Sequence, residues 1–135
     1  MAELSNPFLV RVYWEDTDAG GVVFYANYLK FFERARTEWL RALGIEQRAL
    51  QETAGSIFVV ADVALRYLAP AKLDDLLTVT VKVLEVGKAS IALEQQAWRG
   101  DVLLAQGTVR VGCVNASSLR PCRIPALVAT RLAVA

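Results

Sequence analysis

Residues 11–28 read Arg-Val-Tyr-Trp-Glu-Asp-Thr-Asp-Ala-Gly-Gly-Val-Val-Phe-Tyr-Ala-Asn-Tyr, and this stretch decides the fold. Strand-forming aromatic and β-branched residues come first, followed by two carboxylates, a Gly-Gly turn and the start of a helix. The first N–H groups of a helix lack intrahelical acceptors and carry the positive end of its dipole. The order therefore predicts that Asp16 or Asp18 faces the N–H groups of residues 23–27.

A carboxylate beside a helix start suits acyl transfer, in which negative charge develops on a carbonyl oxygen while another group activates the nucleophile. The chain contains no histidine. Ser-His-Asp and Cys-His catalysis and His-ligated metal sites are therefore excluded within one subunit, and a carboxylate is the best remaining base. Asp16 is expected to end the strand or cap the turn. For Asp18, a purely structural role would be to stabilise the helix dipole by about 0.3–1 kcal/mol.

The segments on either side of this stretch have regular patterns. Phe8 to Glu15 is strand-like, and residues 28–43 carry apolar side chains at helical spacing. Asn27 is the expected N-cap of this helix, and Gly44 the residue that ends it. Glu46 to Thr53 predicts a short second helix.

The second half of the chain predicts a sheet. Ile57 to Leu68 alternates with apolar residues on both faces, which is typical of a strand in the centre of a sheet. Strands at 77–83, 90–98 and 102–114 follow, joined by tight turns, and predict an antiparallel meander. Ala126 to Ala135 predicts a short apolar helix. The fold class is therefore α+β, with one antiparallel sheet wrapped around one long central helix.

Composition and charge limit the classes of protein that remain. The 135 residues fit one domain, 1–135, and 55% hydrophobic content is enough for a core. A net charge of +1 implies neither a nucleic acid partner nor an anionic membrane. No apolar run has the roughly 18 residues that membrane insertion requires, and the N-terminus resembles no export signal, so the expected location is cytoplasmic. The two cysteines, Cys113 and Cys122, fit a reducing compartment, with Cys113 expected in the core.

The stretch that decides the fold also carries a family resemblance. Arg11-Val12, followed after four residues by Thr17-Asp-Ala-Gly-Gly-Val-Val-Phe-Tyr-Ala-Asn-Tyr28, resembles the active-site signature of the 4-hydroxybenzoyl-CoA thioesterase family, which has the hotdog fold. Four further segments look like the Tol-Pal-associated acyl-CoA thioesterases, which are bacterial and cytoplasmic: Glu33–Leu40, Arg66–Pro70, Leu73–Asp75 and Val109–Cys113.

The resemblance implies an enzyme that hydrolyses a fatty acyl-CoA thioester to the free acid and CoA, without a metal or cofactor. The family's catalytic aspartate matches Asp18, and the backbone N–H that polarises the thioester carbonyl matches Tyr25. Many relatives have histidine where Tyr25 stands, so any role of that imidazole is absent here. Asp18 can act as a nucleophile or as a general base, and both routes stay open. The resemblance also implies a homo-oligomer, a dimer or a homotetramer, with the site between subunits.

Binding of CoA calls for local donors, because CoA carries several negative charges. The family lays the pantetheine arm along the turn after Val86, which makes Lys88 and Ser90 the expected substrate-binding residues. Arg120 and Arg123 in the tail are further candidates.

Another branch of hotdog thioesterases places its catalytic carboxylate on the central helix, which draws attention to Glu33 and Glu38. Both lie among arginines in this chain, so ion pairs on the surface or at a subunit interface are the expected role. Two other functions remain open: an aroyl-CoA thioesterase of the same fold, and a non-catalytic scaffold that binds acyl-CoA or acyl carrier protein.

Overall fold

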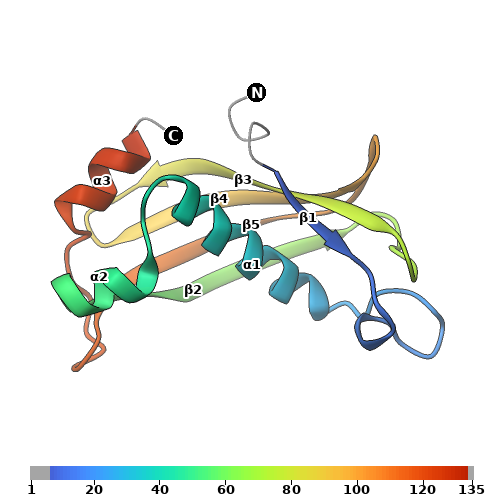
Figure 1. Ribbon diagram of the computed structural model, residues 1–135, viewed down its shortest axis with the longest axis horizontal. Helices are drawn as coiled ribbons and strands as arrows, with labels where there is room; N and C mark the ends of the chain where they lie inside the picture. The colour runs from blue at the N-terminus through green and yellow to red at the C-terminus, as the bar shows by residue number, and fades with distance from the viewer. Residues whose placement is uncertain (1–6, 134–135) are drawn as a thin grey trace.

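The computed structural model describes residues 7–133, in which helices pack on a five-stranded antiparallel sheet (Figure 1). The strands are β1 (Phe8–Arg11), β2 (Ser56–Tyr67), β3 (Leu76–Val86), β4 (Ser90–Arg99) and β5 (Val102–Asn115). The helices are α1 (Asn27–Ala42), α2 (Gln47–Ala54) and α3 (Ala126–Ala133), and a 3₁₀ turn, η2, spans Trp14–Asp16. The strand order is β1-β3-β4-β5-β2, so the predicted meander of β3, β4 and β5 is confirmed.

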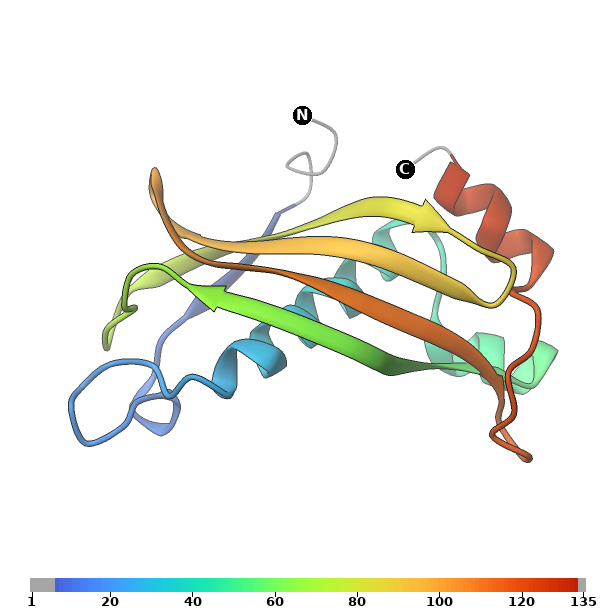
Figure 2. The ribbon, with the colours of Figure 1, turned by 180° about the vertical axis from the view of Figure 1, so that it is seen from behind.

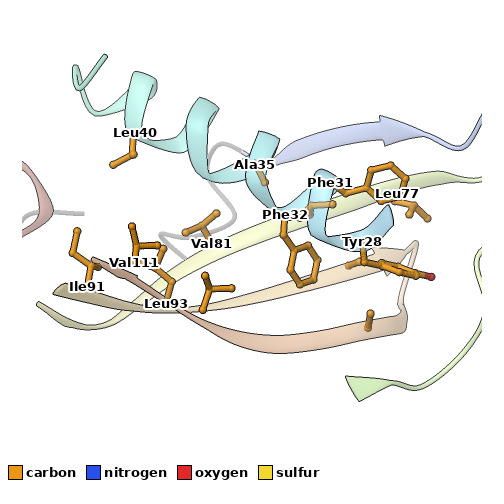
Figure 3. Packing of buried hydrophobic residues seen from close by; sticks show 14 of the residues in the cluster. Tyr28, Phe31, Phe32, Ala35, Leu40, Leu77, Val81, Ile91, Leu93 and Val111 are labelled. Atoms are coloured by element: carbon orange, nitrogen blue, oxygen red, sulfur yellow. The ribbon is translucent and has the colours of Figure 1, made fainter. Parts of the chain in front are cut away.

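One face of the sheet curves around α1, which confirms the predicted hotdog architecture (Figures 1 and 2). Side chains of α1 at helical spacing are buried against the sheet: Tyr28, Phe31, Phe32, Ala35 and Leu40. Figure 3 shows Phe32 and Leu40 pointing from the helix toward the strands. Burial of each large side chain contributes about 1.5–3 kcal/mol, so this stripe holds the helix in place. Among residues 7–133, no helix has the length and apolar character needed to cross a bilayer.

The first strand is shorter than the sequence predicts, because β1 ends at Arg11 and the chain turns into η2. The Asp16 side chain caps this turn by accepting a hydrogen bond from the N–H of Tyr13 at 2.8 Å. A short acidic side chain that bonds nearby backbone competes with strand pairing in this way. The strand predicted to reach Glu15 is therefore wrong, and the capping role predicted for Asp16 is confirmed.

The central helix ends where predicted but starts differently. Gly44 has a φ of +80°, and its N–H donates to the carbonyl of Arg41 at 3.0 Å, which closes the helix. At the other end the N-cap is Ala26, and no side chain caps the helix. Asn27 is instead the first helical residue, and its side-chain amide donates to the carbonyl of Asp16 at 2.9 Å. The prediction of Asn27 as N-cap is wrong because this longer-range bond takes its side chain.

β2 lies at an edge of the sheet and not in its centre, which corrects the prediction from its alternation. Its register with β5 shifts between Val60 and Asp62. Val59, Val60 and Val63 are 39%, 49% and 43% exposed. The apolar residues on both faces of β2 therefore do not reflect burial within this chain.

The two cysteines lie side by side near the end of β5. Cys113 is fully buried, as predicted, and its Sγ lies 3.4 Å from that of Cys122, which is partly buried. Burial raises the pKa of the Cys113 thiol to about 11, and the hydrogen bond with Cys122 adds to this effect. Cys113 therefore stays protonated at neutral pH and behaves as a core residue.

Gly107 allows β5 to approach β2 closely, and we expect alanine there to be costly. It pairs with Leu65, and a Cβ would overlap the carbonyl oxygen of Ala64. Gly107→Ala should lower the free energy of unfolding by about 1–3 kcal/mol, measured from urea denaturation. Gly112→Ala is the control on the same strand, because its Cβ would lie 3.9 Å from the nearest atom. Equal losses in the two variants would contradict this account.

Candidate active site

Residues 17–23 form a small hairpin between η2 and α1. Thr17 and Val23 form an antiparallel bridge, and the N–H of Asp18 donates to the carbonyl of Val22 at 2.9 Å. The turn is closed by the N–H of Gly21, which donates to the carbonyl of Asp18 at 3.0 Å. Gly21 has a φ of +80°, a conformation that glycine adopts at little cost. The Gly-Gly pair therefore makes the tight turn that follows Asp18.

The carboxylate of Asp18 is bound on one side only. Its Oδ1 accepts hydrogen bonds from the N–H of Gly20 at 2.8 Å and from that of Val22 at 3.4 Å. Its Oδ2 accepts none from the part of the chain that the structure describes. The side chain is exposed in the single chain. One oxygen therefore holds the orientation of the carboxylate, and the other is available to a ligand.

The hairpin is attached to the start of α1 through the carbonyl of Asp16. This oxygen accepts hydrogen bonds from the N–H of Phe24 and from the side chain of Asn27, each at 2.9 Å. No acceptor for the N–H of Tyr25 lies among the described residues. The structure thus brings Asp18 and Tyr25 onto one compact segment, with an unused carboxylate oxygen and an unused N–H at the helix start.

The hairpin also rests on the segment before β3. The N–H of Val23 donates to the carbonyl of Ala71 at 2.9 Å. Asp75 holds this segment, because its Oδ2 accepts hydrogen bonds from the N–H of Lys72 at 2.8 Å and from Arg99 at 2.9 Å. Partial burial alone would raise the pKa of Asp75, but these two hydrogen bonds lower it overall. Asp75 therefore stays ionised and keeps the support of the hairpin in place.

Tyr67, at the end of β2, is a site residue that the sequence reasoning missed. Its hydroxyl donates to the carbonyl of Tyr25 at 3.0 Å, and its ring lies 5.4 Å from that of Tyr28. Burial and the neighbouring Tyr25 raise the pKa of Tyr67, so the hydroxyl remains a donor at neutral pH. Tyr67 belongs to Arg66–Pro70, one of the segments that resemble the family, but no local sequence pattern indicates that it contacts residue 25.

The turn between β3 and β4 lies at the other end of the sheet from the segment between η2 and α1 (Figure 2). Lys88 is in this turn and Ser90 directly follows it, so both are far from Asp18 within one chain. β3 runs from the segment that supports the hairpin to the turn that holds Lys88, and its 11 residues span roughly 36 Å. The carbonyl of Lys88 accepts a hydrogen bond from the N–H of Ile124, so the segment with Arg120 and Arg123 lies at the same end. The predicted CoA-binding residues are thus together, but apart from the predicted catalytic pair.

The two glutamates of α1 have different surroundings. Glu38 pairs with Arg41 at 3.0 Å, as predicted. Glu33 accepts a hydrogen bond from the Thr37 hydroxyl at 2.7 Å and makes no ion pair within residues 7–133, so for this residue only the predicted pair across an interface stays a prediction. In the described part of the chain, no three His, Cys, Asp or Glu side chains lie together in a way that would hold a metal ion.

Comparison with known proteins identifies relatives of this chain. The model of the thioesterase superfamily matches residues 20–106, a range that includes Tyr25 and begins just after Asp18. A protein named acyl-CoA thioesterase YbgC, from Haemophilus influenzae, is 51% identical over 118 residues, which are 87% of each chain.

Solved structures agree with this result. A probable thioesterase from Bartonella henselae is 35% identical with a TM-score of 0.85, over 89% of this chain and 98% of that one. A gentisyl-coenzyme A thioesterase is 26% identical with a TM-score of 0.86, over 94% of this chain and 99% of that one. Both align along almost their whole length with this chain.

We expect Tyr67→Phe to loosen the start of α1. The change removes the hydrogen bond to the carbonyl of Tyr25, which should lower the free energy of unfolding by about 0.5–1.5 kcal/mol and speed amide exchange at residues 24–28. Tyr25→Phe is the control, since within the described residues its hydroxyl has no partner. Unaltered amide exchange in Tyr67→Phe would show that this bond does not hold the segment.

Proposed function

The chain belongs to the thioesterase superfamily, and from this premise we propose that Asp18 and the backbone N–H of Tyr25 form its catalytic centre. It is an acyl-CoA thioesterase, which hydrolyses the thioester to the free acid and CoA. One observation carries the assignment of the centre: Oδ2 of Asp18 and the N–H of Tyr25, which have no hydrogen-bond partner among residues 7–133, lie on one short, tightly hydrogen-bonded segment.

In the proposed mechanism the thioester carbonyl oxygen accepts a hydrogen bond from the N–H of Tyr25. The dipole of α1 adds positive potential there, so negative charge that develops on this oxygen is stabilised. Oδ2 of Asp18 either attacks the carbonyl carbon, which gives a mixed anhydride and CoA thiolate, or takes a proton from a water that attacks. Hydrolysis of the anhydride in the first route gives the same products as the second.

The proposed active unit is a homo-oligomer built on paired β2 edges. Support comes from the exposed valines of β2, Val59, Val60 and Val63, and from its free edge. A two-fold axis at the middle of β2 pairs the strand antiparallel with its copy, so the Ser56 end of one faces the Tyr67 end of the other. The end of the sheet with Lys88 then lies beside the end with Asp18 of the second copy. This pairing would unite the residues that one chain keeps apart.

The proposed substrate is a fatty acyl-CoA, with Lys88 and Ser90 binding the CoA part. An aroyl-CoA is the second candidate, supported by the structural likeness to a gentisyl-coenzyme A thioesterase. The proposed location is the cytoplasm, where the thiols of Cys113 and Cys122 would stay reduced. Acyl carrier protein is a further proposed partner.

Asp18→Asn should lower kcat by about 100-fold or more, because asparagine keeps an oxygen for Gly20 but cannot act as base or nucleophile. The assay measures the CoA thiol that is released from acyl-CoAs of graded chain length and from an aroyl-CoA. Comparison of these substrates also decides between the two substrate classes. Asp16→Asn is the matched control and should change kcat only a few-fold, since its side chain caps η2. Unchanged kcat in Asp18→Asn would remove Asp18 from the mechanism.

Val63→Asp should separate the copies and abolish turnover, because it places a charge on the apolar edge of β2. Molecular mass in solution is measured by sedimentation, beside the thiol assay. Val102→Asp is the control, since Val102 is 41% exposed against 43% for Val63 but lies at the start of β5. A Val63→Asp variant with the mass of the unchanged protein would argue against pairing through β2.

A further inference from the structure

A cavity of about 350 Å³ lies between α1, α2 and the inner face of the sheet, and no step of the mechanism above uses it. Most of its wall is apolar, with Trp39, Leu40, Phe58, Val60, Ile91, Leu93 and Val111. Figure 3 shows Leu40 of α1 above Ile91 and Val111 of the sheet. A cavity with such walls suits an apolar ligand, and its few polar groups then decide which one.

Arg36 is the cation in the wall of this cavity, and a buried glutamine side chain positions its guanidinium. Its Nη1 donates to Oε1 of Gln95 at 3.0 Å. Gln95 is fully buried, and its amide donates in turn to the carbonyl of Phe32 at 3.0 Å. The guanidinium is thus fixed by a neutral side chain that is itself locked into the core.

The charge of Arg36 is not balanced by a close carboxylate. Within residues 7–133, no Asp or Glu oxygen lies within 4.0 Å of its guanidinium nitrogens. Burial lowers the pKa of Arg36, and the more distant Glu33 opposes this shift. A guanidinium has five N–H donors, and a partly buried guanidinium with a single neutral side-chain acceptor gains from a further acceptor. The cavity therefore favours a ligand that brings an oxygen.

Glu33 supplies the complementary acceptor in the same wall. Its Oε2 accepts from the hydroxyl of Thr37 at 2.7 Å, and that hydroxyl accepts from the amide of Gln47 at 3.2 Å. Oε1 of Glu33 has no donor in the described part of the chain. Glu33 makes no ion pair with Arg36, but the two opposite charges lie in the same wall, so this wall carries no net charge and a neutral ligand is preferred. A hydroxyl fits both groups, because it accepts from Arg36 and donates to Glu33, whereas a carboxylate would be repelled by Glu33.

We propose that this cavity binds the acyl group of the substrate and that Arg36, with Glu33, selects acyl groups that carry a hydroxyl. The inference rests on the proposed function. At about 30 Å³ for each water-sized group, the volume holds roughly a dozen heavy atoms, the size of a medium acyl chain or one aromatic ring. Phe58 and Val60 belong to the Ser56 half of β2, which in the proposed pair faces the half that bears Tyr67 and contacts Tyr25 in the second copy.

The test compares kcat/KM within matched sets of substrates. Butanoyl-, hexanoyl- and octanoyl-CoA are each used with a terminal methyl, hydroxyl or carboxylate, and benzoyl-CoA is paired with 4-hydroxybenzoyl-CoA. A hydrogen bond to a charged group predicts a preference of about tenfold or more for the hydroxyl over the methyl or hydrogen at the length that reaches Arg36. A preference limited to the straight chains assigns an alkyl hydroxyl, and one limited to the aromatic pair assigns a phenol. The carboxylate should be hydrolysed less well than the hydroxyl.

Arg36→Met should lower the ratio of kcat/KM between the hydroxyl and methyl substrates to near one. Arg34→Met is the matched control, since Arg34 is exposed on the same helix and does not line the cavity. The control should keep the wild-type ratio. Thermal unfolding checks that both variants fold. If Arg36→Met does not fold, the hydroxyl preference in kcat/KM of the wild-type protein decides whether the inference holds.

A wild-type ratio near one at every length and for the aromatic pair would overturn the inference. So would a hydroxyl preference that survives in Arg36→Met. If Arg36→Met instead dissociates the oligomer while the preference persists, Arg36 pairs with a second copy and does not contact substrate. Failure of the proposed catalytic centre is a separate result, because it appears as full activity of Asp18→Asn on the plain substrates.

Discussion

The carbonyl of Asp16 holds the two halves of the candidate site together. It accepts one hydrogen bond from the backbone of Phe24 and one from the side chain of Asn27, so the hairpin and the first turn of α1 cannot move apart independently. Because Asn27 reaches back to this oxygen, α1 begins without a side-chain cap. Among residues 7–133 the N–H of Tyr25, just before the helix, has no acceptor and lies at the positive end of the helix dipole. The two hydrogen bonds to the carbonyl of Asp16 therefore fix the position of the hairpin that carries Asp18 relative to the start of α1.

The proposed catalytic and CoA-binding residues lie at opposite ends of the sheet, so in the proposed mechanism one chain alone is incomplete. Asp18 and Tyr25 lie before the start of β3, and Lys88 and Ser90 lie after its end. In the proposed mechanism the thioester must reach Asp18 and Tyr25 while the CoA part of the same molecule binds at Lys88 and Ser90. An antiparallel copy across β2 would place the second set beside the first, and it would also cover valines that are otherwise half exposed. The same pairing would bring the proposed acyl cavity of one copy toward Tyr25 of the other.

Local pattern was enough to predict most of the fold. The apolar stripe of α1, the alternation of β3 to β5 and the glycine after α1 each depend on neighbouring residues, and each is confirmed. The catalytic roles proposed for Asp18 and Tyr25 came from the family resemblance. The early end of β1 has a local cause, the bond from the N–H of Tyr13 to Asp16, but the position of β2 depends on distant partners, because alternation in β2 does not reveal which strands flank it. The bonds from Tyr67 to Tyr25 and from Arg36 to Gln95 join residues 42 and 59 positions apart, a separation at which spacing carries no information.

The unequal borders of the sheet have a consequence for assembly. β1 has four residues and β2 has twelve, and the register of β2 is interrupted by the shift after Val60. If two chains join through β2, the two long edge strands pair with each other, and the two short β1 strands become the edges of the combined sheet. A border of four residues offers too few unpaired backbone groups to recruit another strand. The combined sheet would therefore stop growing at two chains, and the protein would be protected against the open-ended stacking that leads to fibrils.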